Sequence, residues 1–225
     1  DVDLRVAGTL DRPSVTGDVV LSQGSLRGFG LEQKIEGVEA HVSGRGTAIS
    51  LEEATVPMGD GAVEASGYVA LDPSAAPAFR FRVKLNDPEL AIRDLLEARF
   101  SGGLRWSGTT ERSQLEGSVS IDKLDVVYEV SLTELLTRRA SRVVVQLPDE
   151  TGAVVHLDID VDLSEPANIE SNVASISLQG GVHVGGTTDD PLITGSVYAE
   201  EGATLKYLDH EFALETLTIA YVDPR

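Results

Sequence analysis

Residues with the chemistry for catalysis or metal binding are scattered along this chain and form no known motif. The four histidines, His41, His156, His183 and His210, lack the spacing of a zinc-binding pair. The 225 residues contain no cysteine, which excludes a disulfide framework and a cysteine-based metal site. A Gly-x-Ser-x-Gly elbow and a phosphate-binding glycine loop ahead of a helix are also missing from the sequence. We therefore predict that the protein is not an enzyme, with no catalytic residues, no metal and no cofactor.

Two acidic segments come closest to a site. In Asp209-His210-Glu211, a histidine lies between two carboxylates, which could serve acid–base chemistry, but a simple turn accounts for it as well. Asp158-x-Asp160-x-Asp162 is similar to the start of a calcium loop, yet the sixth position is Leu163 and the twelfth is Ile169. An EF-hand needs glycine and glutamate there. We interpret the three aspartates as the solvated face of a strand.

Composition excludes several classes of partner. The chain has 18 basic and 37 acidic side chains, a formal net charge of −19. Nucleic acid and anionic membrane surfaces are bound through clustered Lys and Arg, so neither is expected. The hydrophobic fraction of 41% is ordinary for a globular protein. No segment has the length of a membrane span, and no signal peptide opens the chain. Because Asp1 begins in mid-pattern, we expect a piece of a larger protein.

Three segments repeat without a gap: Gly8–Val19, Gly108–Val119 and Gly186–Val197. The first and third share Gly, Thr, Asp, Pro, Thr and Gly at identical offsets, and Ser113 replaces the proline in the middle one. Each follows a short run of alternating apolar residues, so the repeats extend over residues 4–24, 104–124 and 182–202. This pattern predicts a strand, a turn and a second strand in each repeat.

Apolar residues alternate with polar ones through most of the chain, as in Phe79–Leu85 and Val155–Leu163. A period of two predicts half-buried strands with one apolar face. About a dozen such runs, with no Pro- or Gly-rich linker, indicate a single all-β domain over residues 1–225. We predict an elongated, curled β-sheet of antiparallel type with an apolar interior.

Two segments break this alternation and predict short helices. Asp87-Pro88-Glu89 has the signature of a helix start, and Ile92, Leu95 and Leu96 follow at helical spacing. Ser131–Glu134 is a capping-box pattern that opens an insertion near 131–142. We interpret both as insertions that cap an end of the sheet; a gate or a partner contact is the alternative.

The apolar strand faces need a cover that two short helices cannot provide. The sheet must therefore close as a sandwich, barrel or solenoid, or curl into a trough. The chain has few aromatic residues (5%), and its strands carry mainly Val, Ile and Leu, which favours an open groove. The expected lining of this hydrophobic groove is Leu4, Val6, Ile49, Leu51, Phe79, Phe81, Leu104, Trp106, Leu157, Ile159, Val161, Leu178, Val182 and Val184.

The last third of the chain resembles a known family. The residues that carry the resemblance are Leu157–Val161, Pro166–Ile169, Leu178–Thr187, Pro191–Val197, Gly202, Tyr207, Phe212 and Asp223-Pro224. The order and spacing of these residues are similar to those of the C-terminal domain of the TamB family, the large subunit of the translocation and assembly module. This family is related to AsmA-like and repeating β-groove lipid-transfer proteins. The segment from Asp1 to Gly117 resembles preceding repeats of the same family, and residues 125–155 match least.

The resemblance implies a β-taco, a long curled sheet with an apolar interior. It also implies a periplasmic location, as part of a protein anchored in the inner membrane by a helix outside this chain. The implied partner is an Omp85-family barrel of the outer membrane, TamA- or BamA-like. The implied roles are phospholipid transport to the outer membrane and assembly of outer-membrane proteins.

The sequence leaves three classes of function to compare. The first is a β-groove that shields phospholipid acyl chains, nascent outer-membrane protein strands, or both. The second is a structural or adhesive β-solenoid with a sealed core, similar to an autotransporter passenger. The third is a polysaccharide hydrolase on a β-sandwich, which would need paired carboxylates and aromatic sugar platforms that the sequence does not display. We favour the first.

Overall fold

A computed structural model of the chain describes residues 1–9, 12–28, 31–71, 75–92, 96–128, 154–207 and 210–221. Within these residues every regular element is a strand. The strands are β1 (Val2–Thr9), β2 (Arg12–Gly28), β3 (Leu31–Gly46), β4 (Ala48–Met58), β5 (Gly61–Ala70), β6 (Ala78–Asn86), β7 (Glu89–Ile92), β8 (Leu96–Thr109), β9 (Arg112–Tyr128), β10 (Val154–Ser171), β11 (Ala174–Gly186), β12 (Pro191–Ala199), β13 (Thr204–Tyr207), β14 (His210–Ala213) and β15 (Thr218–Tyr221).

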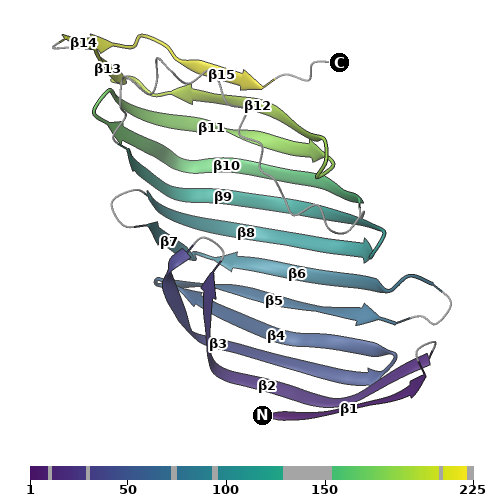
Figure 1. Ribbon diagram of the computed structural model, residues 1–225. Coiled ribbons are helices and arrows are strands. Elements are labelled where there is room, and N and C mark those ends of the chain that lie inside the picture. Colours follow the sequence, from purple (N-terminus) through teal and green to yellow (C-terminus); the bar gives the residue numbers. More distant parts are fainter. Residues whose placement is uncertain are drawn as a thin grey trace.

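The strands form one curled sheet (Figure 1). Its main path runs β1-β2-β3-β4-β5-β6-β8-β9-β10-β11-β12-β15; β7 pairs with β8 beside this path, and β13 pairs with β11 and β14. Every pair is antiparallel except β9 and β10, which run parallel. A parallel pair needs a crossover connection, here residues 129–153, which lie outside the described residues. The predicted all-β curled sheet is confirmed, with one parallel junction added.

The register gathers apolar side chains on one face of the sheet. Directly paired residues of neighbouring strands share a face. One row of such pairs runs from β3 to β8 through Val42, Leu51, Gly67, Phe81 and Trp106. We call the face that carries this row the inner face, and the opposite face, which carries charged residues such as Arg82 and Glu116, the outer face.

Glycines in the middle of strands permit the close approach of neighbouring backbones. Gly117 in β9 has a φ of +144°, and a Cβ at this position would lie 2.1 Å from the carbonyl oxygen of Gly103. Gly195 in β12 has a φ of +124°, and a Cβ there would lie 2.5 Å from the carbonyl oxygen of Gly181. Gly117 is the second glycine of the repeat Gly108–Val119, and Gly195 is the second glycine of the repeat Gly186–Val197. The repeat therefore specifies a strand conformation that only glycine adopts readily. The three repeats contribute the antiparallel pairs β1–β2, β8–β9 and β11–β12, as predicted.

The helix predicted after Asp87 is wrong, because Glu89–Ile92 is strand β7. Asp87 has a φ of +50° and turns the chain, and β7 then pairs antiparallel with the start of β8, Ile92 opposite Leu96. Helical spacing of apolar residues is compatible with such a short hairpin, and the ladder offered by β8 decides the conformation. The second predicted helix, near 131–142, lies outside the described residues.

The sheet is a single layer without a closed core in its described part. Buried apolar side chains there are Val15, Val38, Ala98, Ala167 and Ala203, and no large side chain is fully buried. Within the described residues no helix has the length and apolar character of a membrane span. The apolar surface of this protein is therefore concentrated on the inner face rather than inside a core.

Candidate functional site

All residues predicted to line a groove lie on the inner face. Direct pairs between neighbouring strands connect Leu4, Ile49 and Phe79 and continue as far as β10. Within β10, Leu157 shares their face because side chains alternate along a strand. The other ten share this face by the same register: Val6, Leu51, Phe81, Leu104, Trp106, Ile159, Val161, Leu178, Val182 and Val184. Their common face follows from strict alternation, but their contact with a cargo is an inference taken up below.

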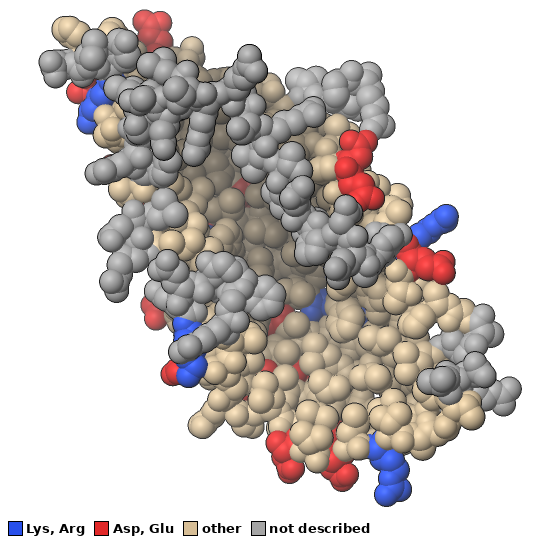
Figure 2. Space-filling view, viewed as in Figure 1, with Lys and Arg blue, Asp and Glu red and all other residues tan. Residues whose placement is uncertain are grey.

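The inner face is apolar and open to solvent. Figure 2 shows a hollowed face in which uncharged residues predominate and most Lys, Arg, Asp and Glu atoms lie toward its margins. Exposure is greatest at the first strand, where Val2 is 70% and Val6 is 68% exposed. Farther along, Leu21, Trp106 and Ile193 keep between 42% and 45% of their surface. Apolar surface of this extent is unusual on a monomer and marks a site of binding or interaction.

Aromatic side chains gather at one place on this face, in β6 and β8. Phe79 and Trp106 have ring centroids 4.7 Å apart in an edge-to-face arrangement. Phe81 lies 5.9 Å from Phe79 and 6.3 Å from Trp106. We call these three residues the aromatic patch. Sequence analysis placed them on the groove face without detecting that they form one cluster, because β6 and β8 are separated by β7.

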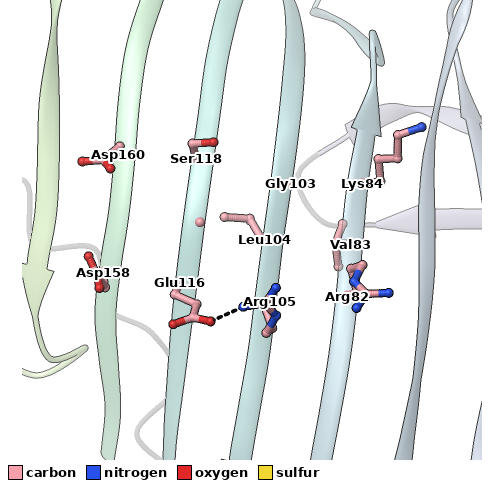
Figure 3. Close-up of a pocket in the computed structure, with 11 residues that line it drawn as sticks. Arg82, Val83, Lys84, Gly103, Leu104, Arg105, Glu116, Ser118, Asp158 and Asp160 are labelled. Atoms are coloured by element: carbon pink, nitrogen blue, oxygen red, sulfur yellow. Dashed lines mark hydrogen bonds and ion pairs between the residues drawn. The ribbon is translucent and has the colours of Figure 1, made fainter.

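The outer face carries charged side chains of both signs. A shallow cavity of about 650 Å³ lies over β6, β8, β9 and β10, between the cations Arg82, Lys84 and Arg105 and the carboxylates of Glu116, Asp158 and Asp160 (Figure 3). Arg105 Nη1 pairs with Glu116 Oε1 at 2.6 Å. His183 Nδ1 lies 2.9 Å from Asp160 Oδ1. Such exposed pairs contribute little stability, at most about 1 kcal/mol each.

The acidic segment of β10 is a solvated face, as the sequence predicted. Asp158, Asp160 and Asp162 are exposed, and the described residues contain no group of three or more side chains able to hold a metal ion. His210 and Glu211 belong to β14, while Asp209 lies outside the described residues. The interpretation of Asp209–Glu211 therefore stays a prediction.

The register reveals a longer internal repeat than the three short segments. Val83 of β6 lies opposite Leu104 of β8, and Val161 of β10 lies opposite Val182 of β11, each 78 residues farther along. Residues 79–119 and 157–197 align without a gap at this offset. We call them the first unit (β6 to β9) and the second unit (β10 to β12). The parallel junction of β9 and β10 is the place where one unit ends and the next begins.

The two units carry opposite charge on the outer face. The first unit has a basic stripe on β6, Arg80, Arg82 and Lys84, and the equivalent positions of the second unit are Asp158, Asp160 and Asp162. The inner-face geometry that the two units share therefore does not depend on the sign of the charges on the outer face.

Comparison with known proteins agrees with this architecture. The family model described as the TamB C-terminal domain matches residues 50–225, most of the chain. The chain belongs to the TamB family. Neither the curated proteins nor the solved structures gave a match. The resemblance stated from the sequence is therefore confirmed at the level of the family.

TamB proteins are transport and assembly modules of the cell envelope and are not known as enzymes. Their role concerns outer-membrane protein assembly and lipid transport. The matched region contains both units and therefore the whole aromatic patch. The matched region also carries most of the open apolar face described above.

Proposed function

We propose that the inner face is a conduit that shields the acyl chains of phospholipids on their way to the outer membrane. The observation that carries this proposal is the apolar face, which runs without interruption across the twelve strands of the main path and is left open to solvent. At about 4.8 Å per strand, the face extends over roughly 50 Å. Acyl chains gain about 0.8 kcal/mol for each methylene that leaves water, so such a face stabilises them without any polar recognition.

Backbone chemistry favours lipid over polypeptide on the inner face. The strands between β1 and β15 are paired on both sides along most of their length, so their N–H and C=O groups are already engaged. A polypeptide lying across them would leave its own amides without partners, which is costly away from water. A hydrocarbon chain has no such groups and meets no such cost.

Nascent outer-membrane protein strands are a second candidate cargo, and they fit a different part of the molecule. β1 has one unpaired edge in the described sheet, and all eight of its residues are exposed. An exposed, alternating edge strand is a template for the addition of another strand. This mode would use the edge of the sheet and leave the inner face free.

Membership of the TamB family supports a proposal for the setting of this activity. We propose a periplasmic location, within a protein anchored in the inner membrane, and cooperation with an Omp85-type barrel, TamA- or BamA-like. The net charge of −19 suits a segment that crosses an aqueous compartment. The whole range 1–225 is proposed to act as one groove domain, since its described strands belong to one sheet.

Photo-crosslinking at neighbouring positions of β10 tests the lipid conduit. Crosslinkers at Ile159 and Val161 face inward, and one at Asp160 faces outward as a matched control. Phospholipid captured at both inward positions and not at Asp160, with lipid bound in native mass spectrometry, supports the conduit. Lipid-free protein with all three positions silent contradicts it and favours the sealed β-solenoid. Capture of protein at crosslinkers in β1 supports strand cargo.

A further inference from the structure

The aromatic patch differs from the rest of the inner face in a way that points to a particular ligand. Trp106 is the only tryptophan of the chain, and it remains 42% exposed although Phe79 and Phe81 pack against it. Aromatic side chains provide large apolar contact areas. A three-ring cluster with an exposed tryptophan, in a chain with 5% aromatic residues, is therefore a local concentration of apolar contact surface.

The one polar atom of the patch is already satisfied. Trp106 Nε1 donates a hydrogen bond to Ser113 Oγ at 3.0 Å, and Ser113 is only 6% exposed. An indole N–H without a partner would have to stay in contact with water. Because this one is engaged, hydrocarbon can cover Trp106 without leaving an unsatisfied donor.

Tryptophan and serine occur together in only one of the three sequence repeats. The positions of Trp106 and Ser113 are occupied by Val6 and Pro13 in the first repeat. In the third repeat they are occupied by Val184 and Pro191. Proline has no hydroxyl to accept the indole hydrogen bond, so the serine accompanies the tryptophan for a chemical reason. The two phenylalanines are also missing from the second unit, which has Leu157 and Ile159 at the positions of Phe79 and Phe81.

Charge at the neighbouring turn distinguishes the two units in the same sense. The turn between β8 and β9 carries Glu111, and Arg112 follows as the first residue of β9, so the two charges cancel. The equivalent turn between β11 and β12 carries Asp189 and Asp190. An anionic phosphate is repelled by the pair of aspartates and meets no net charge at the Glu111–Arg112 pair. The margin of the aromatic patch therefore lacks the repulsion that a phosphate would meet at the same place in the second unit.

We propose that the aromatic patch is a binding subsite for a phospholipid, with an acyl chain against Phe79, Phe81 and Trp106. The second unit has the same backbone geometry without the subsite. This proposal rests on the conduit proposed above and adds that cargo is held at one place on the inner face rather than evenly along it.

Tryptophan fluorescence tests the subsite, because Trp106 is the only tryptophan in the chain. The probe is phosphatidylglycerol with brominated acyl chains, which quench indole on contact. The matched control moves the tryptophan–serine pair to the second unit, as W106V/S113P combined with V184W/P191S. Each substitution places a residue that the fold already accepts at the equivalent position. Far-UV circular dichroism verifies that the variant folds.

The expected result is strong quenching of Trp106 and little quenching of the relocated tryptophan. We also expect about tenfold weaker lipid binding by F79L/F81I/W106V in native mass spectrometry. Equal quenching at both positions overturns the subsite but leaves the conduit standing. Absence of quenching at Trp106 overturns the subsite as well, and the crosslinks at Ile159 and Val161 then decide the fate of the conduit separately.

Discussion

At the scale of single residues, glycines rather than apolar side chains set the path of the strands. Gly117 and Gly103 lie on neighbouring strands and illustrate the difference between a required and a permissive glycine. A Cβ at Gly117 would meet the carbonyl oxygen of Gly103 at 2.1 Å, at a φ of +144°. A Cβ at Gly103 would meet only an ordinary contact, 3.4 Å from the carbonyl oxygen of Val83.

We predict that Gly117→Ala is destabilising and Gly103→Ala is not. The first change imposes a strained backbone and a backbone clash, worth roughly 1–3 kcal/mol or more of unfolding free energy. The second removes the excess chain entropy of a strand glycine and is expected to be neutral or stabilising by up to about 1 kcal/mol. Urea unfolding followed by circular dichroism measures both. Equal midpoints for the two variants would contradict the role assigned to Gly117.

Asp122 provides a pH-dependent contribution to stability. Burial raises the pKa of this carboxyl, but hydrogen bonds from Ser101, Ser164 and Ser120 and a nearby arginine charge outweigh burial, so the pKa lies below its ordinary value of 3.8. The Ser164 hydroxyl donates to Asp122 Oδ1 at 2.5 Å. A depressed carboxyl pKa stabilises the folded state above the unfolded pKa, and this stabilisation is lost as pH falls through the folded pKa.

Asp122→Asn should therefore lower the unfolding midpoint at pH 7, and the deficit relative to the unmodified protein should shrink below about pH 4. Ser164→Ala, which removes one of the hydrogen bonds, should show a smaller deficit with the same pH dependence. The measurement is urea unfolding at a series of pH values from 7 to about 3. A deficit of constant size across the series would show that the carboxylate charge is not involved.

At the scale of elements, β6 and its equivalent β10 show how one strand geometry tolerates opposite charges. The basic stripe of β6 meets both signs of charge on its flanks, with Glu64 of β5 directly opposite Lys84 and Arg105 of β8 directly opposite Arg82. Glu116 and Asp158 lie on strands farther along the same face. Opposite charges on neighbouring strands each contribute about 0.2–1 kcal/mol, and like charges cost a similar amount.

Reversal of the basic stripe, as R80D/R82D/K84D, makes β6 resemble β10 and should leave the fold intact. We expect a lower unfolding midpoint at low ionic strength and recovery of most of the loss in about 0.5 M salt, where surface charges are screened. The matched control is D158N/D160N/D162N in β10, which removes repulsion among the carboxylates together with their charged contact to His183 and should change the midpoint little. A salt-independent loss in the reversal variant would point to packing rather than charge.

The elements also show which parts of the structure can be read from sequence. Alternation as in Phe79–Leu85 predicts both the strand and the face of each side chain, because the side-chain period of a strand is two. The segment after Asp87 misleads, because a capping pattern is local and the pairing of β7 with β8 is not. The contact of Trp106 with Phe79 is equally hidden, since it depends on which strands become neighbours. The serine that replaces proline at position 113 was the available signal for this site.

At the scale of the whole molecule, the inner face exposes apolar side chains to solvent on a regular, hydrogen-bonded sheet. Most soluble domains bury their apolar surface between two layers. Here the described strands form a single layer, and the sheet holds its shape through its ladder of hydrogen bonds, its mid-strand glycines and contacts among neighbouring side chains. A second layer would bury the surface on which a cargo is proposed to lie, so an open face follows from the proposed role.

Such a protein should bind hydrophobic dyes in its native state. We predict that bis-ANS fluoresces with the folded protein and is displaced by phosphatidylglycerol, whereas ordinary globular proteins bind this dye mainly when partly unfolded. Val161→Asp places a charge on the inner face and should reduce both dye and lipid binding, while Asp160→Asn on the outer face should leave both unchanged. Circular dichroism separates loss of binding from loss of fold. Dye binding that appears only at the urea transition would mean that the inner face is covered in solution, and the conduit would then be rejected in favour of a sealed structural domain.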